Sequence, residues 1–282
     1  MKKKKQNNKI AFIGRYNEGE IISGPEKTAK RIFELAASKY EAVFIQYFFD
    51  GGKYSLKNKL FGYEEFMKNG QKIYSMGVIR LIFFLIKFNP DIIHIITFER
   101  FARAAVYYAK LRKVKIIYNS HGIIIHEDEE IKHEKSSYSR KNRKTEKLLL
   151  KSANKIVFPS ESAILTCEIY YKVDESKIEI IPNGIDESFH KIVSSGLRKG
   201  IVFLSGGALH ISRRAFLKEV LYIFNKNLQL FIIGDKEYFS EINIPGVYMF
   251  RAINSSELAE FYKDKDIFLS LNNYDTFSIS TA

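Results

Sequence analysis

Short apolar runs alternate with longer amphipathic segments along the first two thirds of the chain. The runs predicted to form strands are Ile10–Gly14, Ala42–Tyr47, Ile92–Ile96, Lys115–Tyr118, Lys155–Phe158 and Ile178–Ile181. The segments predicted to form helices are Glu26–Tyr40, Met76–Phe88, Phe101–Leu111, Thr145–Ala153 and Ser160–Tyr171. The strand candidates are continuously apolar, as expected when both faces of a sheet are covered. Alternation of strand and helix predicts an α/β fold with a parallel sheet and right-handed crossovers.

The same alternation restarts near Gly200. Predicted strands there are Ile201–Ser205, Gln229–Ile233, Val247–Phe250 and Ile267–Leu271, and predicted helices are Arg213–Phe224 and Ser255–Lys263. The segment His190–Lys199 has no apolar period and contains Ser-Ser-Gly, which is typical of a linker. We therefore predict one domain over residues 1–190, a linker over 191–199 and part of a second domain over 200–282.

Composition fits this division and narrows the compartment. The chain has 282 residues, of which 46% are hydrophobic, so two packed domains are possible. Its single cysteine, Cys167, excludes an internal disulfide framework and indicates a reducing compartment. The run Val78–Phe88 is interrupted by two basic residues and is too short to span a bilayer. A cytoplasmic location is expected.

The formal net charge of +13 admits two interpretations: a solvated basic surface, or contact with anionic lipid. No nucleic-acid recognition motif accompanies the charge, so nucleic acid is not predicted as a partner. The segment Lys132–Lys155 is charge-dense and is expected to form an exposed helix after a loop. Within it, Leu148–Leu150 beside the basic residues would contact an anionic membrane surface, or would instead pack on the sheet.

Two motifs of the first half follow predicted strands. Gly24, before Pro25, would let backbone amides approach an anion at a helix start, or would form a plain turn. His121, followed by Gly122, would reach past the carboxyl edge of the sheet, or would be satisfied at a strand end. His126 and His133 lie among acidic residues, but their spacing matches no zinc signature, so no metal is predicted.

The second half offers candidate anion ligands and a carboxylate. The glycine pair Gly206-Gly207 follows a predicted strand, and Arg213-Arg214 comes soon after; together they would cradle a diphosphate. Neither a Rossmann fingerprint nor a Walker A sequence is present. Gly234 ends the next strand. Asp275 would accept hydrogen bonds from hydroxyl groups, and amides near Phe277 and Ser278 would hold an anion.

The segment Ile178–Asp186 joins the two halves. It is a strand that stops at Pro182 and opens into an Asn183-Gly184 turn, which we expect at the mouth of a cleft between two domains.

In their order along the chain, these motifs resemble those of retaining glycosyltransferases of family 4, which have the GT-B fold of two Rossmann-like domains. The segments that carry the resemblance are Gly24-Pro25, Pro90–His94, Asn119–Gly122, Ala153–Glu161, Ile181–Asp186, Gly234-Asp235 and Asp275–Ser278. The resemblance implies transfer of a sugar from a nucleotide-sugar to a glycan or lipid-linked acceptor in bacterial surface polysaccharide assembly. It implies no cofactor and no metal.

The resemblance also implies roles for residues. The first domain would bind the acceptor and the second the donor, with Gly24 near the donor phosphate and His121 near the transferred sugar. Asp275 would hold the sugar hydroxyls. The donor phosphates and sugar would be bound by Gly24, Asn183, Gly206, Gly207, Arg213, Arg214, Gly234, Phe277 and Ser278. The pair Gly206-Gly207 matches a Gly-Arg pair of the family, so the family's arginine is absent here.

The family's second acid would be residue 283, one position beyond Ala282. We therefore expect an incomplete second domain, weak or no binding of a nucleotide-sugar by the 282-residue chain, and no turnover by it. Two other functions stay open: a GT-B remnant or binding subunit without activity, and an unrelated Rossmann-like nucleotide-binding protein. Release of UDP or GDP from a sugar donor would exclude the second of these.

Overall fold

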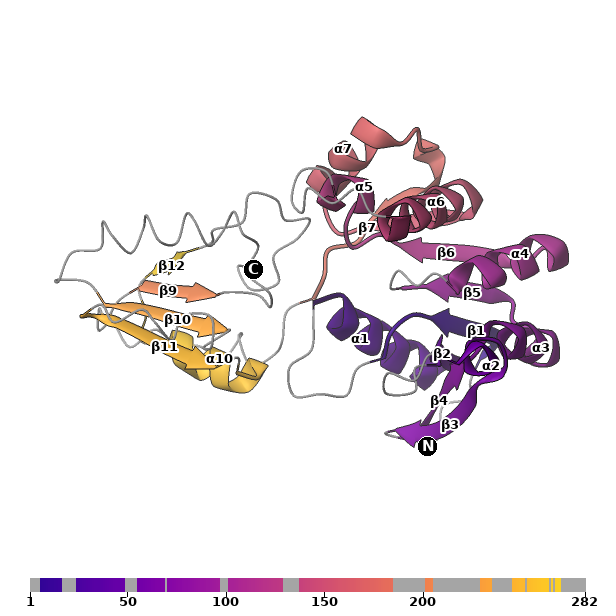
Figure 1. Cartoon of the computed structure of the whole chain (residues 1–282), viewed down its shortest axis with the longest axis horizontal. Coiled ribbons are helices and arrows are strands. Elements are labelled where there is room, and N and C mark those ends of the chain that lie inside the picture. Colours follow the sequence, from indigo (N-terminus) through magenta and orange to yellow (C-terminus); the bar gives the residue numbers. More distant parts are fainter. Residues whose placement is uncertain are drawn as a thin grey trace. The chain divides into compact units, whose positions relative to one another are not determined.

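The computed structural model divides the chain into two compact units, one ending at Pro182 and the other beginning at Asn183 (Figure 1). It describes residues 6–16, 24–48, 55–68, 70–96, 101–128, 137–184, 201–204, 229–234, 245–251, 253–263, 265 and 267–269. The predicted linker over residues 191–199 lies outside the described residues. The predicted domain limits therefore stay a prediction.

The first unit is built on an eight-stranded sheet in the order β3-β4-β2-β1-β5-β6-β7-β8. The strands are β1 (Gln6–Ile13), β2 (Tyr40–Tyr47), β3 (Tyr63–Lys68), β4 (Gln71–Met76), β5 (Ile92–Ile95), β6 (Lys115–Asn119), β7 (Lys155–Phe158) and β8 (Ile178–Ile180). All neighbouring pairs are parallel except β3 and β4. The predicted α/β fold is confirmed, and the sheet is parallel except for this one pair.

Helices connect these strands. They are α1 (Gly24–Lys39), α2 (Leu56–Phe61), α3 (Val78–Phe88), α4 (Ala102–Arg112), α5 (Ile124–His126), α6 (Ser137–Ser152), α7 (Glu161–Tyr170) and the 3₁₀ turn η2 (Glu175–Lys177). Each of the five predicted helices of this half corresponds to one of them, and the largest difference is at α6, which begins eight residues before the predicted Thr145. Two further helices, α2 and α5, were not predicted.

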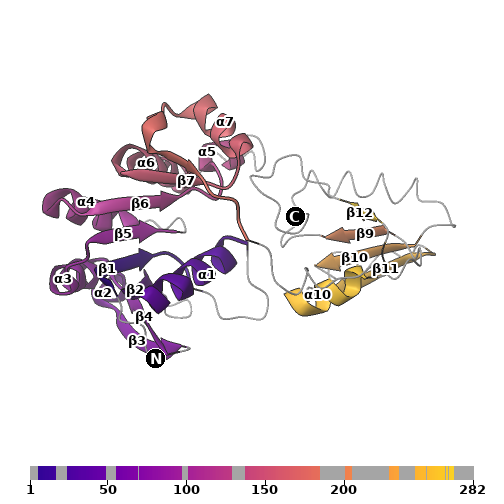
Figure 2. The ribbon, with the colours of Figure 1, turned by 180° about the vertical axis from the view of Figure 1, so that it is seen from behind.

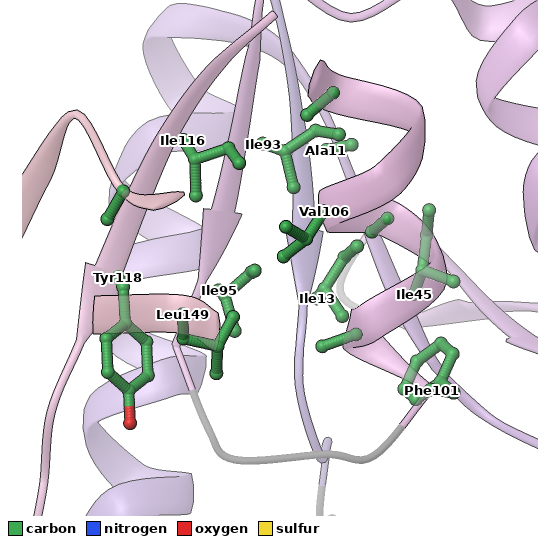
Figure 3. Close-up of a cluster of buried hydrophobic side chains, with 14 of the residues drawn as sticks. Ala11, Ile13, Ile45, Ile93, Ile95, Phe101, Val106, Ile116, Tyr118 and Leu149 are labelled. Carbon is green, nitrogen blue, oxygen red and sulfur yellow. The ribbon is translucent and has the colours of Figure 1, made fainter. Parts of the chain in front are cut away.

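The helices cover the sheet on both faces. One buried cluster joins α1 to the sheet through Phe33, whose ring lies 5.5 Å from that of Phe12 and 5.3 Å from that of Phe44. The other, larger cluster joins the opposite face to α3, α4, α6 and α7 (Figure 3). Val106 of α4 and Leu149 of α6 belong to it, and both are fully buried. Figure 2 shows the same unit from behind.

The strand order reverses beside β1. From β1 the chain passes through α1 to β2 on one side, and later crosses through α3 to β5 on the other side. In open α/β sheets the carboxyl ends of the strands at such a point line the ligand site. The connectivity therefore predicts that the ligand site lies at the loops that follow β1, β5 and β6.

The antiparallel pair β3–β4 is a correction to the prediction of a wholly parallel sheet. Tyr63 pairs with Met76 and Lys68 with Gln71, so the two strands form a hairpin. Gly70 has φ +73°, a backbone angle that glycine adopts without strain. The signal was present in the sequence, because Asn-Gly between apolar segments is the strongest short-range indication of a hairpin.

The described part of the second unit contains a parallel sheet in the order β11-β10-β9-β12. Its elements are β9 (Ile201–Leu204), β10 (Leu230–Gly234), β11 (Val247–Arg251), α10 (Ser255–Tyr262) and β12 (Ile267–Leu269). Asn254 and Glu257 form a reciprocal capping box that fixes the start of α10. The order again reverses, here beside β9. The predicted helix Arg213–Phe224 lies outside the described residues.

Helix α6 corrects one expectation about the surface. Leu149 and Leu150 are buried, and the half-buried Leu148 packs against the same core. The prediction that these leucines contact lipid is therefore wrong; the alternative, that they pack on the sheet, is confirmed. Within the part of the chain that the structure describes, no helix combines the length and apolarity needed to cross a bilayer.

Candidate functional site

His121 lies in the loop that leaves the carboxyl end of β6. Three contacts fix the backbone around it. Ser120 N–H donates to the Val157 carbonyl at 2.9 Å, and the Ser120 hydroxyl donates to the Gly122 carbonyl at 3.3 Å. Further along, Ile124 N–H donates to Oε1 of Glu146 at 2.8 Å. His121 is therefore held on a fixed loop; the residue is partly exposed, but its Nε2 atom is buried.

The imidazole of His121 is neutral near pH 7. Burial lowers its pKa to about 4; the backbone of Ile96 opposes this shift, and the neighbouring His94 adds to it. A neutral imidazole donates one hydrogen bond and accepts another but brings no positive charge. It is therefore suited to hold a hydroxyl group and unsuited to neutralise a phosphate.

A second histidine supports the same edge from β5. Nε2 of His94 lies 2.7 Å from Oδ1 of Asn119, and since an amide oxygen only accepts, this nitrogen carries the proton. The His94 ring also lies 5.2 Å from the ring of Phe12. Burial lowers its pKa to about 4. The Phe12–His94–Asn119 line crosses β1, β5 and β6 on the face that α1 covers, and it fixes Asn119 two residues before His121.

Glu146 of α6 binds the backbone of the loop that contains His121. Its carboxylate is fully buried and accepts hydrogen bonds from Ile124 N–H and, at 2.7 Å, from the hydroxyl of Tyr171. Burial raises the pKa of Glu146 to about 7, although both hydrogen bonds favour the charged form. Carboxyl groups with strongly perturbed pKa values gather at functional sites.

Glu146 was not among the predicted site residues, because the composition of its segment is that of an exposed charged helix. The signal was its spacing. Glu146 precedes Leu149 and Leu150 by three and four residues, so it lies on the apolar face of the helix.

At the end of β1, Arg15 faces the start of α1. Its Nε lies 3.4 Å from Oε1 of Glu26, a mostly buried residue in the first turn of α1. The Arg15 side chain is otherwise 71% exposed. Gly24 is the first residue of α1, two residues before the predicted start at Glu26, so the Arg15 guanidinium lies beside the first turn of this helix. Arg15 was not among the predicted site residues, although it directly follows Gly14 at the strand end.

Four of the predicted site residues lie among the described residues, and each of them follows a strand or ends one. Gly24 and His121 follow β1 and β6, which are separated in the sheet only by β5. Asn183 comes after β8, whose pairing extends to a hydrogen bond from Ile181 N–H to the Phe158 carbonyl at 2.9 Å. Gly234 is the last residue of β10 and pairs with Arg251. Their binding roles stay predictions.

The remaining predicted residues lie outside the described residues. They are Gly206, Gly207, Arg213, Arg214, Asp275, Phe277 and Ser278. In the sequence the glycine pair follows β9 and Asp275 follows β12, and these two strands are neighbours. Among the described residues, no three His, Cys, Asp or Glu side chains are grouped to hold a metal ion. The expectation that no metal takes part stays a prediction.

Comparison with known proteins gives a family and a fold. Residues 29–189 match the model of Glycosyltransferase Family 4. No curated protein sequence matches the chain.

Three solved structures illustrate the fold. HepE of Anabaena in complex with UDP-glucose has a TM-score of 0.64 and 14% identity, over 92% of this chain and 72% of HepE. The lipopolysaccharide outer core galactosyltransferase WaaB in its apo form has a TM-score of 0.61 and 14% identity, over 96% and 76% of the two chains. TarM, known from S. aureus, has a TM-score of 0.62 and 11% identity, over 97% and 82%. At these identities the likeness shows the fold alone, and the predicted GT-B fold class is confirmed.

Proposed function

The chain belongs to Glycosyltransferase Family 4, and from that premise we propose that it is a retaining transferase that moves a sugar from a nucleotide-sugar donor to a glycan or lipid-linked acceptor. The process would be bacterial surface polysaccharide assembly, at the cytoplasmic face of the membrane. One observation carries the proposal: the family match covers residues 29–189, which include β6, the His121 loop and the helix that anchors it.

The charges that develop during transfer determine the role of each residue. Breaking the bond between sugar and phosphate leaves positive character on the sugar ring and negative charge on the departing diphosphate. Arg213 and the amides of Gly206 and Gly207 would stabilise the diphosphate. Asp275 would hold the sugar hydroxyls. The leaving phosphate would take the proton of the acceptor hydroxyl on the same face of the sugar.

His121 would hold the transferred sugar through a hydroxyl group. Its neutral state supports this role, because a cationic imidazole would oppose positive character on the sugar ring. Its loop supports the role as well, since hydrogen bonds from Ser120 and to Glu146 fix the backbone on either side. A side chain held in this way loses little freedom when substrate binds.

The donor to test first is a UDP-sugar, because HepE was solved with UDP-glucose. UDP-glucose, UDP-galactose, UDP-N-acetylglucosamine and GDP-mannose would be supplied in turn with a bacterial lipid extract as acceptor. Release of free UDP or GDP and transfer of labelled sugar to the lipid fraction are the two measurements.

The decisive variant is His121→Ala, with His126→Ala as the matched control, both made in a version of the chain extended to the length of its relatives. His126 is an imidazole five residues further on, and its Nδ1 lies 3.2 Å from the hydroxyl of Tyr170 on α7. We expect His121→Ala to lower kcat by about 100-fold with nucleotide affinity nearly unchanged, and His126→Ala to retain activity. Equal activity of wild type and His121→Ala would refute the assigned role. Failure of a version extended to the length of its relatives to release nucleotide from every donor would refute the transferase proposal.

A further inference from the structure

The short helix α5 follows the His121 loop and connects it to the helices that come later in the chain. It contacts both α6 and α7 (Figures 1 and 2). Ile123, just before α5, is fully buried in the larger core cluster, and its carbonyl accepts from Glu127 N–H at 2.9 Å. The position of His121 therefore depends on how α5 is held against α6 and α7.

Glu146 of α6 joins this segment to the end of α7. One carboxylate oxygen, Oε1, accepts from Ile124 N–H at 2.8 Å, and the other, Oε2, accepts from the Tyr171 hydroxyl at 2.7 Å. Tyr171 caps α7 with an extended backbone, and its N–H donates to the Cys167 carbonyl at 2.8 Å. The tyrosine that binds Glu146 is therefore attached to the last turn of a helix. A single carboxyl group thus links α5, α6 and α7.

A second carboxylate packs against the residue that follows His121. A Cβ atom added to Gly122 would overlap Oε1 of Glu127, so only glycine fits beside this carboxylate without a shift. On the other side of His121 in the sequence, Ser120 N–H donates to the backbone of β7. His121 therefore lies between two fixed neighbours, and Glu146 holds the backbone three residues further on.

The carboxyl group of Glu146 carries a cost that an apolar side chain would avoid. Burial raises its pKa to about 7, so the site disfavours its charged form. An apolar residue of similar size avoids this cost, but it leaves Ile124 N–H and the Tyr171 hydroxyl without the acceptor that they have here. The carboxyl at this place therefore indicates a role in fixing the loop rather than in filling the core.

We propose that Glu146 is a positioning residue for the transfer reaction, which sets the place of His121 by binding Ile124 and Tyr171 at the same time. Glu146 is fully buried, so it acts through the loop and not by contact with substrate. The inference rests on the proposed function, in which His121 holds the transferred sugar. It adds to that site a residue of α6 and the tyrosine that orients it.

The first test follows His121 and His94 by nuclear magnetic resonance titration in the 282-residue chain, without donor. Burial lowers the pKa of both imidazoles to about 4, but His94 is bound to Asn119 of β6 and not to the loop. In Glu146→Ala we expect the pKa of His121 to rise toward 6.5 while that of His94 stays near 4. Glu146→Gln should keep both values, because an amide also binds both partners.

The second test measures turnover in a version extended to the length of the relatives. Glu146→Ala should lower kcat about 100-fold. The KM for the donor should be nearly unchanged, because His121 would act on the sugar during transfer. Glu146→Gln should restore most of the lost turnover. A side chain that only stabilised the fold would not produce this split between kcat and KM.

A matched pair of variants isolates the link through Tyr171. Tyr171→Phe removes the hydroxyl that binds Glu146, and Tyr170→Phe removes the hydroxyl that lies 3.2 Å from Nδ1 of His126. Each variant deletes one oxygen atom, from consecutive residues at the end of α7. We expect Tyr171→Phe to lower kcat about 10-fold, which corresponds to the loss of one hydrogen bond. Tyr170→Phe should have the activity of the wild type.

Thermal melting shows which variants fold, and if Glu146→Ala does not fold, Tyr171→Phe decides the test. Four results would overturn the proposal: a pKa of His121 that stays near 4 in a folded Glu146→Ala, equal changes at His94 and His121, a Glu146→Gln variant no better than Glu146→Ala, or equal losses in the two tyrosine variants. The titrations need no donor. An extended chain that releases no nucleotide therefore refutes only the transferase, and unmoved titrations in an active enzyme refute only the positioning role.

Discussion

Replacing Glu146 by Gln should remove a pH-dependent loss of stability that the wild type carries. The native pKa of Glu146 is raised from 4.5 to about 7, chiefly by burial. In the unfolded chain the carboxyl loses its proton from about pH 4.5 upward, whereas the folded chain keeps it until about pH 7. Stability from this group is therefore fully present below about pH 4.5 and is lost as pH rises to about 7.

The size of the effect follows from the shift. One pH unit corresponds to about 1.4 kcal/mol, so the free energy of unfolding should fall by about 3 kcal/mol across this window because of Glu146 alone. Glutamine resembles the protonated carboxyl: its amide oxygen would accept from Ile124 N–H, and its amide nitrogen would donate to the Tyr171 hydroxyl, which donates to Oε2 of Glu146 in the wild type. The variant should therefore lack this dependence on pH.

The assay is urea unfolding of both proteins from about pH 4 to about pH 9. Between about pH 4.5 and pH 7, the unfolding free energy of the wild type should fall by about 3 kcal/mol relative to that of Glu146→Gln. Outside this range the difference between the two proteins should not depend on pH. Glu146→Ala serves as a second comparison. Alanine removes the acceptor for Ile124 N–H, so hydrogen exchange at that amide should be faster in the Glu146→Ala variant than in the wild type. In the Glu146→Gln variant it should be unchanged. Parallel pH profiles for wild type and Gln would refute the reasoning.

Three further predictions rest on separate features. Nuclear magnetic resonance titration should give His121 and His94 pKa values of about 4, and stability linked to them should fall as pH drops below about 6.5; an ordinary value near 6.5 for either would contradict its burial. Gly77→Ala should destabilise the first unit by about 1–3 kcal/mol in a thermal or urea melt, because the added Cβ would lie 2.5 Å from backbone of α2; an unchanged melt would show that α2 yields. Burial raises the pKa of the Cys167 thiol to about 12, so labelling by a thiol reagent should follow the unfolding rate; fast labelling of the folded chain would contradict this.

The sequence predicted elements well wherever hydrophobic pattern alone decides them. The strand Lys155–Phe158 was predicted residue for residue, and α4 differs from its prediction by one residue at each end. These segments are apolar because neighbouring elements bury them. The same burial imposes a spacing of apolar residues that can be counted in the sequence. The predicted lipid contact of Leu148–Leu150 failed for a related reason. A helix with charge on one side and leucines on the other is compatible with both a sheet and a bilayer.

For the candidate site, the sequence could place residues at strand ends but not choose their partners. His121 and Gly24 were found because each follows a strand and adjoins or is a glycine. Arg15 was missed because one basic residue after a strand is common. Glu146 was missed because its role depends on a backbone amide 22 residues earlier.

What the sequence determined by itself is the alternation of strand and helix, the parallel arrangement and the family pattern, because each arises from local periodicity or from motif order. Tertiary structure alone decided the strand order that reverses at β1 and the burial that lowers the pKa values of His94 and His121 to about 4 and raises that of Glu146 to about 7. These properties depend on contacts between residues far apart in the chain. A pKa responds to the surroundings of a group, and a strand order depends on which strands become neighbours. Neither quantity is carried by any single stretch of sequence.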